Sequence, residues 1–188
     1  INLFAKLRKD NTIFMEEVTK DRDIHHGVYI DIFPLDSIPD TKLERCIHRS
    51  ILVFLDLFRL SSEMQIVRAS SSGARKLVGR ILHPLARRVV DSRYIRVIDS
   101  LAKAHMERNT IMVSNLYGDT IRWYDRPRQA QPRETFDSCV YLRFEDGNFP
   151  APRDWHQYLT AVYGDYMVPP PIEHRHPQHG IIKINLGA

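Results

Sequence analysis

The sequence predicts an α+β protein, because strand-like segments near both ends of the chain flank a helical middle. Near the N-terminus, HHGVYIDIFPLD at residues 25–36 places apolar or aromatic side chains on both faces of an extended chain, which predicts a strand buried on both sides. From residue 41 to about 108, apolar residues recur at helical spacing. Strand-like segments follow at residues 111–113 and 140–144. A length of 188 residues fits one domain, so we expect a single domain, 1–188, with a helical subregion at 41–108.

The N-terminal elements are expected to deliver the chain into the strand around Asp31. Residues 1–10 are expected to end a short helix, and residues 12–15 to form a strand. The polar run at residues 16–23 is then a loop or a hairpin. Pro34 ends the strand that follows, because proline cannot donate a hydrogen bond to a strand ladder.

The helical middle divides into three predicted helices. The first begins at Thr41, which forms a capping-box pattern with Glu44, and continues to about Glu63. A serine-rich loop separates it from a second helix, which Pro84 is expected to break or kink. The third helix starts at Ser92 and keeps its apolar residues on one face.

The last third of the chain is expected to add a hairpin and a further helix. Turn-forming residues at 145–148 follow the strand-like segment at 140–144. Pro152 is expected just inside a helix that stops at Gly164. The tail beyond this helix is rich in proline and histidine.

The composition is that of an ordinary globular protein and excludes several classes. Hydrophobic residues make up 43% and charged residues 27%, which argues against disorder. No apolar run reaches the about 18 residues of a membrane span. Two cysteines, Cys46 and Cys139, are too few for a disulfide framework and favour a reducing compartment. We therefore expect a cytoplasmic protein, with at most a peripheral contact at the inner face of the membrane.

Positive charge is concentrated in one part of the chain. Residues 68–108 hold ten basic and three acidic residues, a net charge of +7 in a chain whose total is +4. Contact with phosphates or with an anionic membrane surface would explain this asymmetry, and so would a solvated helical face. Few aromatic residues interleave with the basic ones, so nucleic acid is not an expected partner.

Asp31 is the first candidate for chemistry, because its carboxylate interrupts an otherwise apolar strand. A buried carboxylate is costly unless a cation, a metal or several donors meet it. A metal-assisted active site is one explanation, and a structural aspartate bonded to an arginine or to loop amides is the other. Asp36, beyond Pro34, either caps the turn or adds a second carboxylate to the site.

Histidines and one arginine complete the candidates. His25 and His26 precede the strand, and at most one of them faces the same side as Asp31. Arg175, in the tail, suits bidentate binding of phosphate. A zinc site is a further option for the tail, through three imidazoles at His174, His176 and His179.

Two long segments of the chain follow a specific pattern in a fixed order. The first is HHGVYIDIFPLD at residues 25–36, and the second runs from Phe144 through FPAP and YGDYM to His179. A shorter stretch precedes them, with Leu7, Arg8 and Thr12. Together these segments resemble the LicD family of phosphotransferases, which includes the fukutin-related proteins and carries an HxGxxIDIFPLD segment.

The resemblance implies a fold and an activity. The family is placed in the nucleotidyltransferase-fold superfamily, which implies a nucleotidyltransferase-like mixed sheet with a helical insertion. Its better-known members move a phosphorylated alcohol, such as phosphocholine or ribitol phosphate, from a CDP-activated donor to a cell-surface glycan such as lipopolysaccharide or teichoic acid. A CDP-alcohol donor and a glycan acceptor are therefore the expected partners.

The resemblance also implies roles for individual residues. Asp31 matches a carboxylate that holds a divalent metal, so it is expected to be catalytic and to bind Mg²⁺. The ion would neutralise charge on the diphosphate while the acceptor hydroxyl is aligned. His26, Asp36, Arg175 and His179 are expected to bind substrate.

The family's paired aspartates are expected upstream of this segment. Asp21 and Asp23 form a DxD pattern by letter, but they lie in a polar run and not in an apolar strand. The resemblance thus describes an N-terminally incomplete LicD-like domain, which fits a chain that begins at Ile1. The alternative is a non-catalytic module that binds a glycan or a membrane surface through the helices of residues 68–108.

Overall fold

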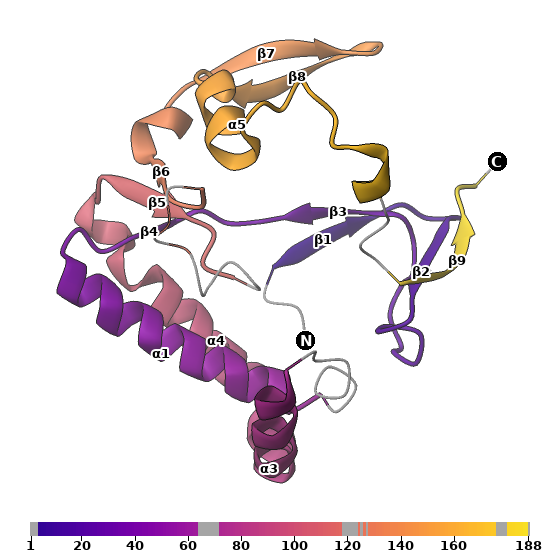
Figure 1. Ribbon diagram of the computed structural model, residues 1–188, viewed down its shortest axis with the longest axis vertical. Coiled ribbons are helices and arrows are strands. Elements are labelled where there is room, and N and C mark those ends of the chain that lie inside the picture. Colours follow the sequence, from indigo (N-terminus) through magenta and orange to yellow (C-terminus); the bar gives the residue numbers. More distant parts are fainter. Residues whose placement is uncertain are drawn as a thin grey trace. The chain divides into compact units, whose positions relative to one another are not determined.

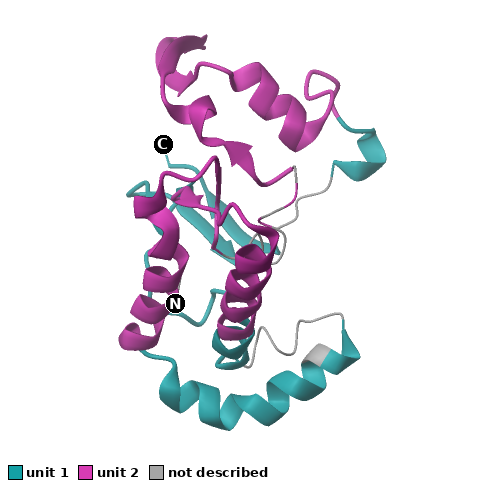
Figure 2. Ribbon diagram, turned by 90° about the vertical axis from the view of Figure 1, so that its left-hand side faces the viewer, with its two compact units in different colours: residues 1–33, 57–91, 170–188 teal, residues 34–56, 92–169 magenta. Residues whose placement is uncertain are grey.

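The structure is a computed structural model that describes residues 4–63, 72–117, 124, 126, 128–175 and 180–187. Helices and small antiparallel sheets occur together along the chain, so the predicted α+β class is confirmed (Figure 1). The chain divides into two compact units, which Figure 2 colours separately. The first comprises residues 1–33, 57–91 and 170–188, and the second comprises residues 34–56 and 92–169.

Two small antiparallel sheets form the β-structure of the first unit. β1 (Ala5–Arg8) pairs with β3 (Tyr29–Ile32), and β2 (Ile13–Glu16) pairs with β9 (Ile181–Asn185). The strands predicted at β2 and β3 are confirmed. The helix end predicted over residues 1–10 is wrong, because β1 occupies this segment and is the ladder partner of β3.

Thr12 and Gly27 join the two sheets at the start of β3. The buried Thr12 hydroxyl donates to the Lys9 carbonyl at 2.7 Å and accepts from the Val28 N–H at 2.9 Å. The Lys9 N–H donates to the Val28 carbonyl at 2.8 Å. A Cβ atom at Gly27 would lie 2.3 Å from the Lys9 carbonyl oxygen, so only glycine permits this close approach.

The helices α1 (Lys42–Ser61) and α3 (Gly73–Val89) confirm the first two predicted helices. At the start of α1 the Glu44 N–H donates to the Thr41 hydroxyl oxygen at 3.3 Å, which is one half of the predicted capping box. The Glu44 carboxylate accepts from the same hydroxyl at 2.9 Å. α3 runs through Pro84 without a break, and the serine-rich loop before it lies mostly outside the described residues.

The second unit has a three-stranded antiparallel sheet in the order β4 (Asp36–Ser37), β5 (Met112–Ser114) and β6 (Gln131–Pro132). The third predicted helix is confirmed as α4 (Ser92–Ala102), which continues into the 3-10 helix η1 (Lys103–Arg108). The Tyr94 hydroxyl of α4 donates to the Leu55 carbonyl of α1 at 2.8 Å. The core of this unit consists of buried apolar and aromatic side chains: Ile38, Leu52, Ile98, Leu116, Tyr117 and Tyr124.

The same unit continues with the 3-10 helix η3 (Arg133–Phe136), the predicted hairpin of β7 (Cys139–Phe144) and β8 (Gly147–Pro152), and α5 (Trp155–Tyr163). Gly164 ends α5 with a φ of 74°, as predicted. Pro152 does not begin the helix, because it ends β8 opposite Cys139. A last 3-10 helix, η4 (Ile172–His174), belongs to the first unit.

The strand pairs of the described residues are all antiparallel, in sheets of two or three strands. The nucleotidyltransferase-like mixed sheet therefore stays a prediction, as does a single domain over residues 1–188. α1, α3, α4 and η1 occupy the range expected for the helical subregion, 41–108. Among the helices of the described residues, none has the length and apolar character to cross a membrane.

Candidate functional site

Asp31 lies on β3 directly opposite Lys6 of β1. The Lys6 ammonium is 2.7 Å from Asp31 Oδ1. The same ammonium lies over the ring of Tyr29, 3.7 Å from its centroid, which is a cation–π contact. Asp31 therefore has a cationic partner, as the sequence required. The structural alternative predicted an arginine or loop amides, whereas the partner is Lys6 of the neighbouring strand.

β3 is open on one face, which corrects the prediction of a strand buried on both sides. Ile30 is 68% exposed and Ile32 is 53% exposed, whereas the Asp31 side chain is 27% exposed. β3 belongs to a sheet of only two strands, β1 and β3, and the face of this sheet that carries Ile30 is exposed. Asp31 points to the opposite face of β3, where its side chain is 27% exposed and its Oδ1 atom is buried.

The surroundings of Asp31 combine aromatic rings with charges of both signs. The Tyr29 hydroxyl donates to Glu16 Oε2 at 3.4 Å, and burial together with the Glu16 charge raises the pKa of Tyr29. The Arg8 guanidinium lies 5.0 Å from the Tyr29 ring centroid and donates to the Gly27 carbonyl at 3.1 Å. Lys6 and Arg8 both contact the Tyr29 ring, and two cations held this close together can bind a phosphate group.

The described residues alone do not fit a magnesium ion at Asp31. Mg²⁺ requires near-octahedral coordination by oxygen atoms and normally takes one or two carboxylates together with substrate phosphates. In the part of the chain that the structure describes, no three His, Cys, Asp or Glu side chains come together as a metal site. Lys6 also contacts the Asp31 oxygen that a metal would use. Metal binding by Asp31 stays a prediction.

The other predicted substrate contacts do not bond to Asp31 among the described residues. His26 is half-buried, and its Nδ1 atom has no hydrogen-bond partner there. Arg175 is exposed and donates from Nε to the Pro170 carbonyl at 2.7 Å, which closes its own turn. His179 and its neighbour His176 lie outside the described residues, so the role of His179 and the zinc option stay predictions.

Asp36 belongs to the second unit and is 1% exposed. It begins β4 opposite Ser114, so it does not cap a turn. The Tyr117 hydroxyl interacts with the Asp36 carboxylate and donates to Asp99 Oδ1 at 2.8 Å. Burial raises the pKa of Asp36, and burial together with the neighbouring Asp99 carboxylate raises the pKa of Tyr117.

Lys103 completes this cluster, which we call the Asp36 cluster: Asp36, Asp99, Lys103 and Tyr117. The Lys103 ammonium donates to Asp99 Oδ2 at 2.7 Å. Although burial alone would raise it, the hydrogen bonds from Lys103 and Tyr117 lower the pKa of Asp99. Asp36 lies too deep to meet a substrate in this arrangement, and its role as a substrate contact stays a prediction.

The site contains functional side chains that the sequence did not single out. Lys6 and Tyr29 are recognised only once the β1–β3 register is known. Tyr117 reaches Asp36 from 81 positions further along the chain. Asp99 and Lys103, by contrast, are four residues apart, a spacing that brings side chains together on a helix and is readable from sequence.

Comparison with known proteins found a partial similarity. Over 52 residues the chain is 42% identical to the lipopolysaccharide cholinephosphotransferase LicD of Haemophilus influenzae. The matched region covers 28% of this chain and 20% of that protein, so the alignment spans about a fifth of the relative. No protein-family model and no solved structure matches the chain. The chain is therefore similar to a LicD transferase over a limited part of its length.

Proposed function

We propose that the chain takes part in the transfer of a phosphorylated alcohol, either phosphocholine or a polyol phosphate, from a CDP-activated donor to a cell-surface glycan. The similarity to a lipopolysaccharide cholinephosphotransferase is the observation that carries this proposal. It is supported by the partly exposed Asp31 side chain, which forms an ion pair with Lys6, and by Arg8, which contacts the ring of the neighbouring Tyr29.

The transfer needs a nucleophile, a leaving group and a base. The acceptor hydroxyl oxygen forms a bond to the phosphorus that bears the alcohol, the bond from that phosphorus to the bridging oxygen breaks, and CMP leaves. In this proposal Asp31 takes the hydroxyl proton, and Lys6 and Arg8 neutralise phosphate charge.

Dependence on Mg²⁺ is part of the proposal, as are contacts of His26, Asp36, Arg175 and His179 with substrate. When bound, the ion would neutralise charge on the donor diphosphate. Since the described residues offer one carboxylate at Asp31 and Lys6 occupies it, we route no step through the ion.

The test is CMP release from CDP-choline and CDP-ribitol in the presence of lipopolysaccharide, with Mg²⁺ and with EDTA, followed by chromatography. Asp31→Asn should lower turnover by about 100-fold or more, since it removes the base. Asp23→Asn makes the same change in the exposed segment before β3 and should leave turnover unchanged. Full activity in Asp31→Asn removes Asp31 from the reaction, and no CMP release from either donor overturns the transfer itself.

The second candidate is the non-catalytic module that binds a glycan or a membrane surface through residues 68–108. One observation favours it: α3, within this range, exposes both apolar and basic side chains. Binding without CMP release would favour this candidate over transfer.

A further inference from the structure

The outward side of α3 exposes five large apolar side chains, each between 45% and 68% exposed. They are Leu77, Val78, Ile81, Leu85 and Val89. Gly79 and Ala86, seven residues apart and therefore on one side of the helix, are buried. We call the exposed set the apolar face of α3. Exposed apolar side chains that gather on one side of a helix are typical of a surface that binds a partner.

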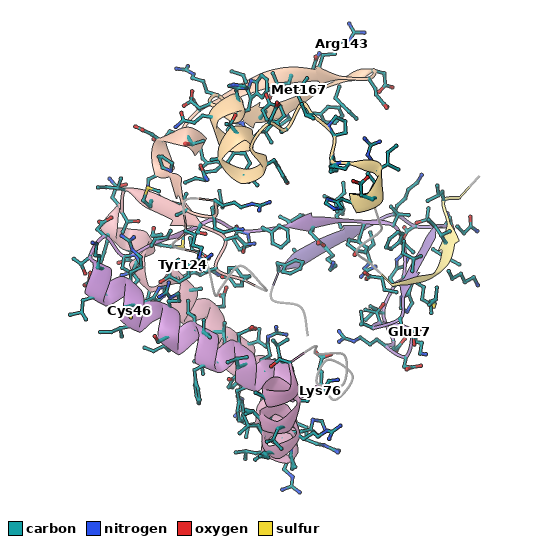
Figure 3. All side chains as sticks on the ribbon, viewed as in Figure 1. Glu17, Cys46, Lys76, Tyr124, Arg143 and Met167 are labelled. Atoms are coloured by element: carbon teal, nitrogen blue, oxygen red, sulfur yellow. The ribbon has the colours of Figure 1, made fainter. Side chains whose placement is uncertain are left out.

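Positive charge borders the apolar face. α3 contains five basic residues, and its 17 residues include no Asp or Glu. Arg80 follows the buried Gly79, and Arg87 follows the buried Ala86. Because successive residues of a helix are about 100° apart, both arginines lie between the buried side and the apolar face, at one border of that face. Figure 3 shows nitrogen-tipped side chains along this helix, on which Lys76 is labelled.

These basic side chains are available to a partner. In the part of the chain that the structure describes, Lys76, Arg80, Arg87 and Arg88 make no ion pair with a carboxylate. α1 also exposes apolar side chains, but it includes Glu44 and Asp56, so its charge is mixed. The combination of an apolar face with only positive charge is particular to α3 among the long helices of the described residues.

We propose that α3 binds an anionic lipid surface, with its apolar face at the boundary of the acyl chains and its basic side chains at the headgroups. A helix with an apolar side and a Lys- and Arg-rich polar side lies in the plane of a membrane interface in this way. A second copy of the chain is a poorer partner, because α3 packed on α3 would bring five basic residues against the same five.

This inference deepens the second candidate above, because it names α3 as the binding element and an anionic lipid surface as its partner, and it does not depend on the proposed transfer. The measurement is co-sedimentation of the chain with vesicles of phosphatidylcholine alone or mixed with phosphatidylglycerol, at low and at high salt. Binding should require the anionic lipid and weaken about tenfold or more at high salt, because the attraction is screened.

Two variants test the two parts of the surface. Ile81→Glu places a negative charge in the apolar face, and Arg80→Glu with Arg87→Glu reverses the basic border, so each should abolish binding to the mixed vesicles. Because these side chains are exposed, far-UV circular dichroism should be unchanged. The matched controls, Leu43→Glu on α1 and Arg143→Glu with Arg153→Glu near the β7–β8 hairpin, alter equally exposed residues and should bind like the unchanged chain.

Binding that survives both α3 variants overturns the inference. A second result would also overturn it: the chain sediments as an oligomer, and Ile81→Glu converts this oligomer to a monomer. The apolar face of α3 would then join copies of the chain. Vesicle binding without CMP release would contradict the proposed transfer and support lipid binding by α3. CMP release without vesicle binding would support the transfer and contradict lipid binding by α3.

Discussion

Asp31 and Asp36 are five residues apart in one segment, yet their surroundings differ in almost every respect. Asp31 belongs to the first unit, keeps 27% of its side chain exposed and forms an ion pair with Lys6. Asp36 belongs to the second unit, is 1% exposed, and meets the Tyr117 hydroxyl in a cluster with Asp99. Burial raises the pKa of Asp36.

The difference shows how one short motif can supply two kinds of carboxylate. Asp31 forms an ion pair with Lys6, and both side chains stay partly exposed, at 27% and 15%. Asp36 is enclosed by the core of its unit. Because burial raises its pKa, the folded state favours the protonated carboxyl over the charged carboxylate. Asp31 therefore stays the candidate for chemistry, and the burial of Asp36 favours a role in the stability of its unit.

The largest expected effect comes from the core around Asp36. Tyr117→Ala removes a buried ring and the hydroxyl that links Asp36 to Asp99, so it should lower the free energy of unfolding by about 3–5 kcal/mol. Urea unfolding followed by circular dichroism measures this change. Tyr141→Ala, at a side chain 70% exposed, should stay within about 0.5 kcal/mol. Equal losses in the two variants would mean that the Asp36 cluster does not stabilise its unit.

The start of the Asp31 strand should respond next. Gly27→Ala forces a Cβ atom against the Lys9 carbonyl, and we expect a loss of about 1–3 kcal/mol in the same unfolding experiment. Gly73→Ala, at the first residue of α3, adds a Cβ atom with nothing within 4 Å and should not destabilise the chain. A neutral Gly27→Ala would show that the close approach of Lys9 and Gly27 is not required.

Asp36→Asn tests the buried member of the pair through pH. The folded pKa of Asp36 is raised above its ordinary value of 3.8, so the folded state holds the proton more tightly and the stability from this group falls as pH rises through the folded pKa. Asparagine carries no charge, so the variant should be more stable than the unchanged chain near neutral pH. For each unit by which the folded pKa of Asp36 exceeds the unfolded pKa, the variant should gain about 1.4 kcal/mol in the free energy of unfolding.

Unfolding curves from about pH 3 to about pH 8 compare the two proteins. Asp99, whose pKa is lowered, contributes in the opposite direction as pH falls, and it is present in both proteins. Their difference therefore isolates Asp36. A constant difference across the whole range would contradict a raised pKa.

The smallest expected effect is the ion pair of Asp31. A double-mutant cycle of Lys6→Met and Asp31→Asn should give a coupling of at most about 1 kcal/mol, because both side chains are partly exposed, and the coupling should shrink at high salt. A coupling of several kcal/mol would make Asp31 a structural residue like Asp36. Urea unfolding of the four proteins measures it.

Local patterns predicted the elements whose signals are local. The apolar spacing of α1, α3 and α4 and the turn before β8 were readable because neighbours in sequence determine them. β1 and β9 were missed, since each depends on pairing with a strand elsewhere in the chain.

The candidate site was predictable in its central residue and not in its partners. A lone carboxylate in an apolar strand indicated Asp31. Its partner Lys6 could not be read without the antiparallel register, and the exposure of Ile30 depends on which of the described residues pack against this face. Asp36 shows the same limit, because its burial depends on Tyr117 and Asp99, which come from distant segments.

The ammonium of Lys6 has three N–H donors, and the ion pair with Asp31 needs one of them. One lysine can therefore hold the carboxylate and still offer donors to a phosphate oxygen. The distance between proton acceptor and phosphorus would then be controlled by a single side chain. Arginine at this position would present a planar and rigid group of donors, so Lys6→Arg would place a bound phosphate differently relative to Asp31.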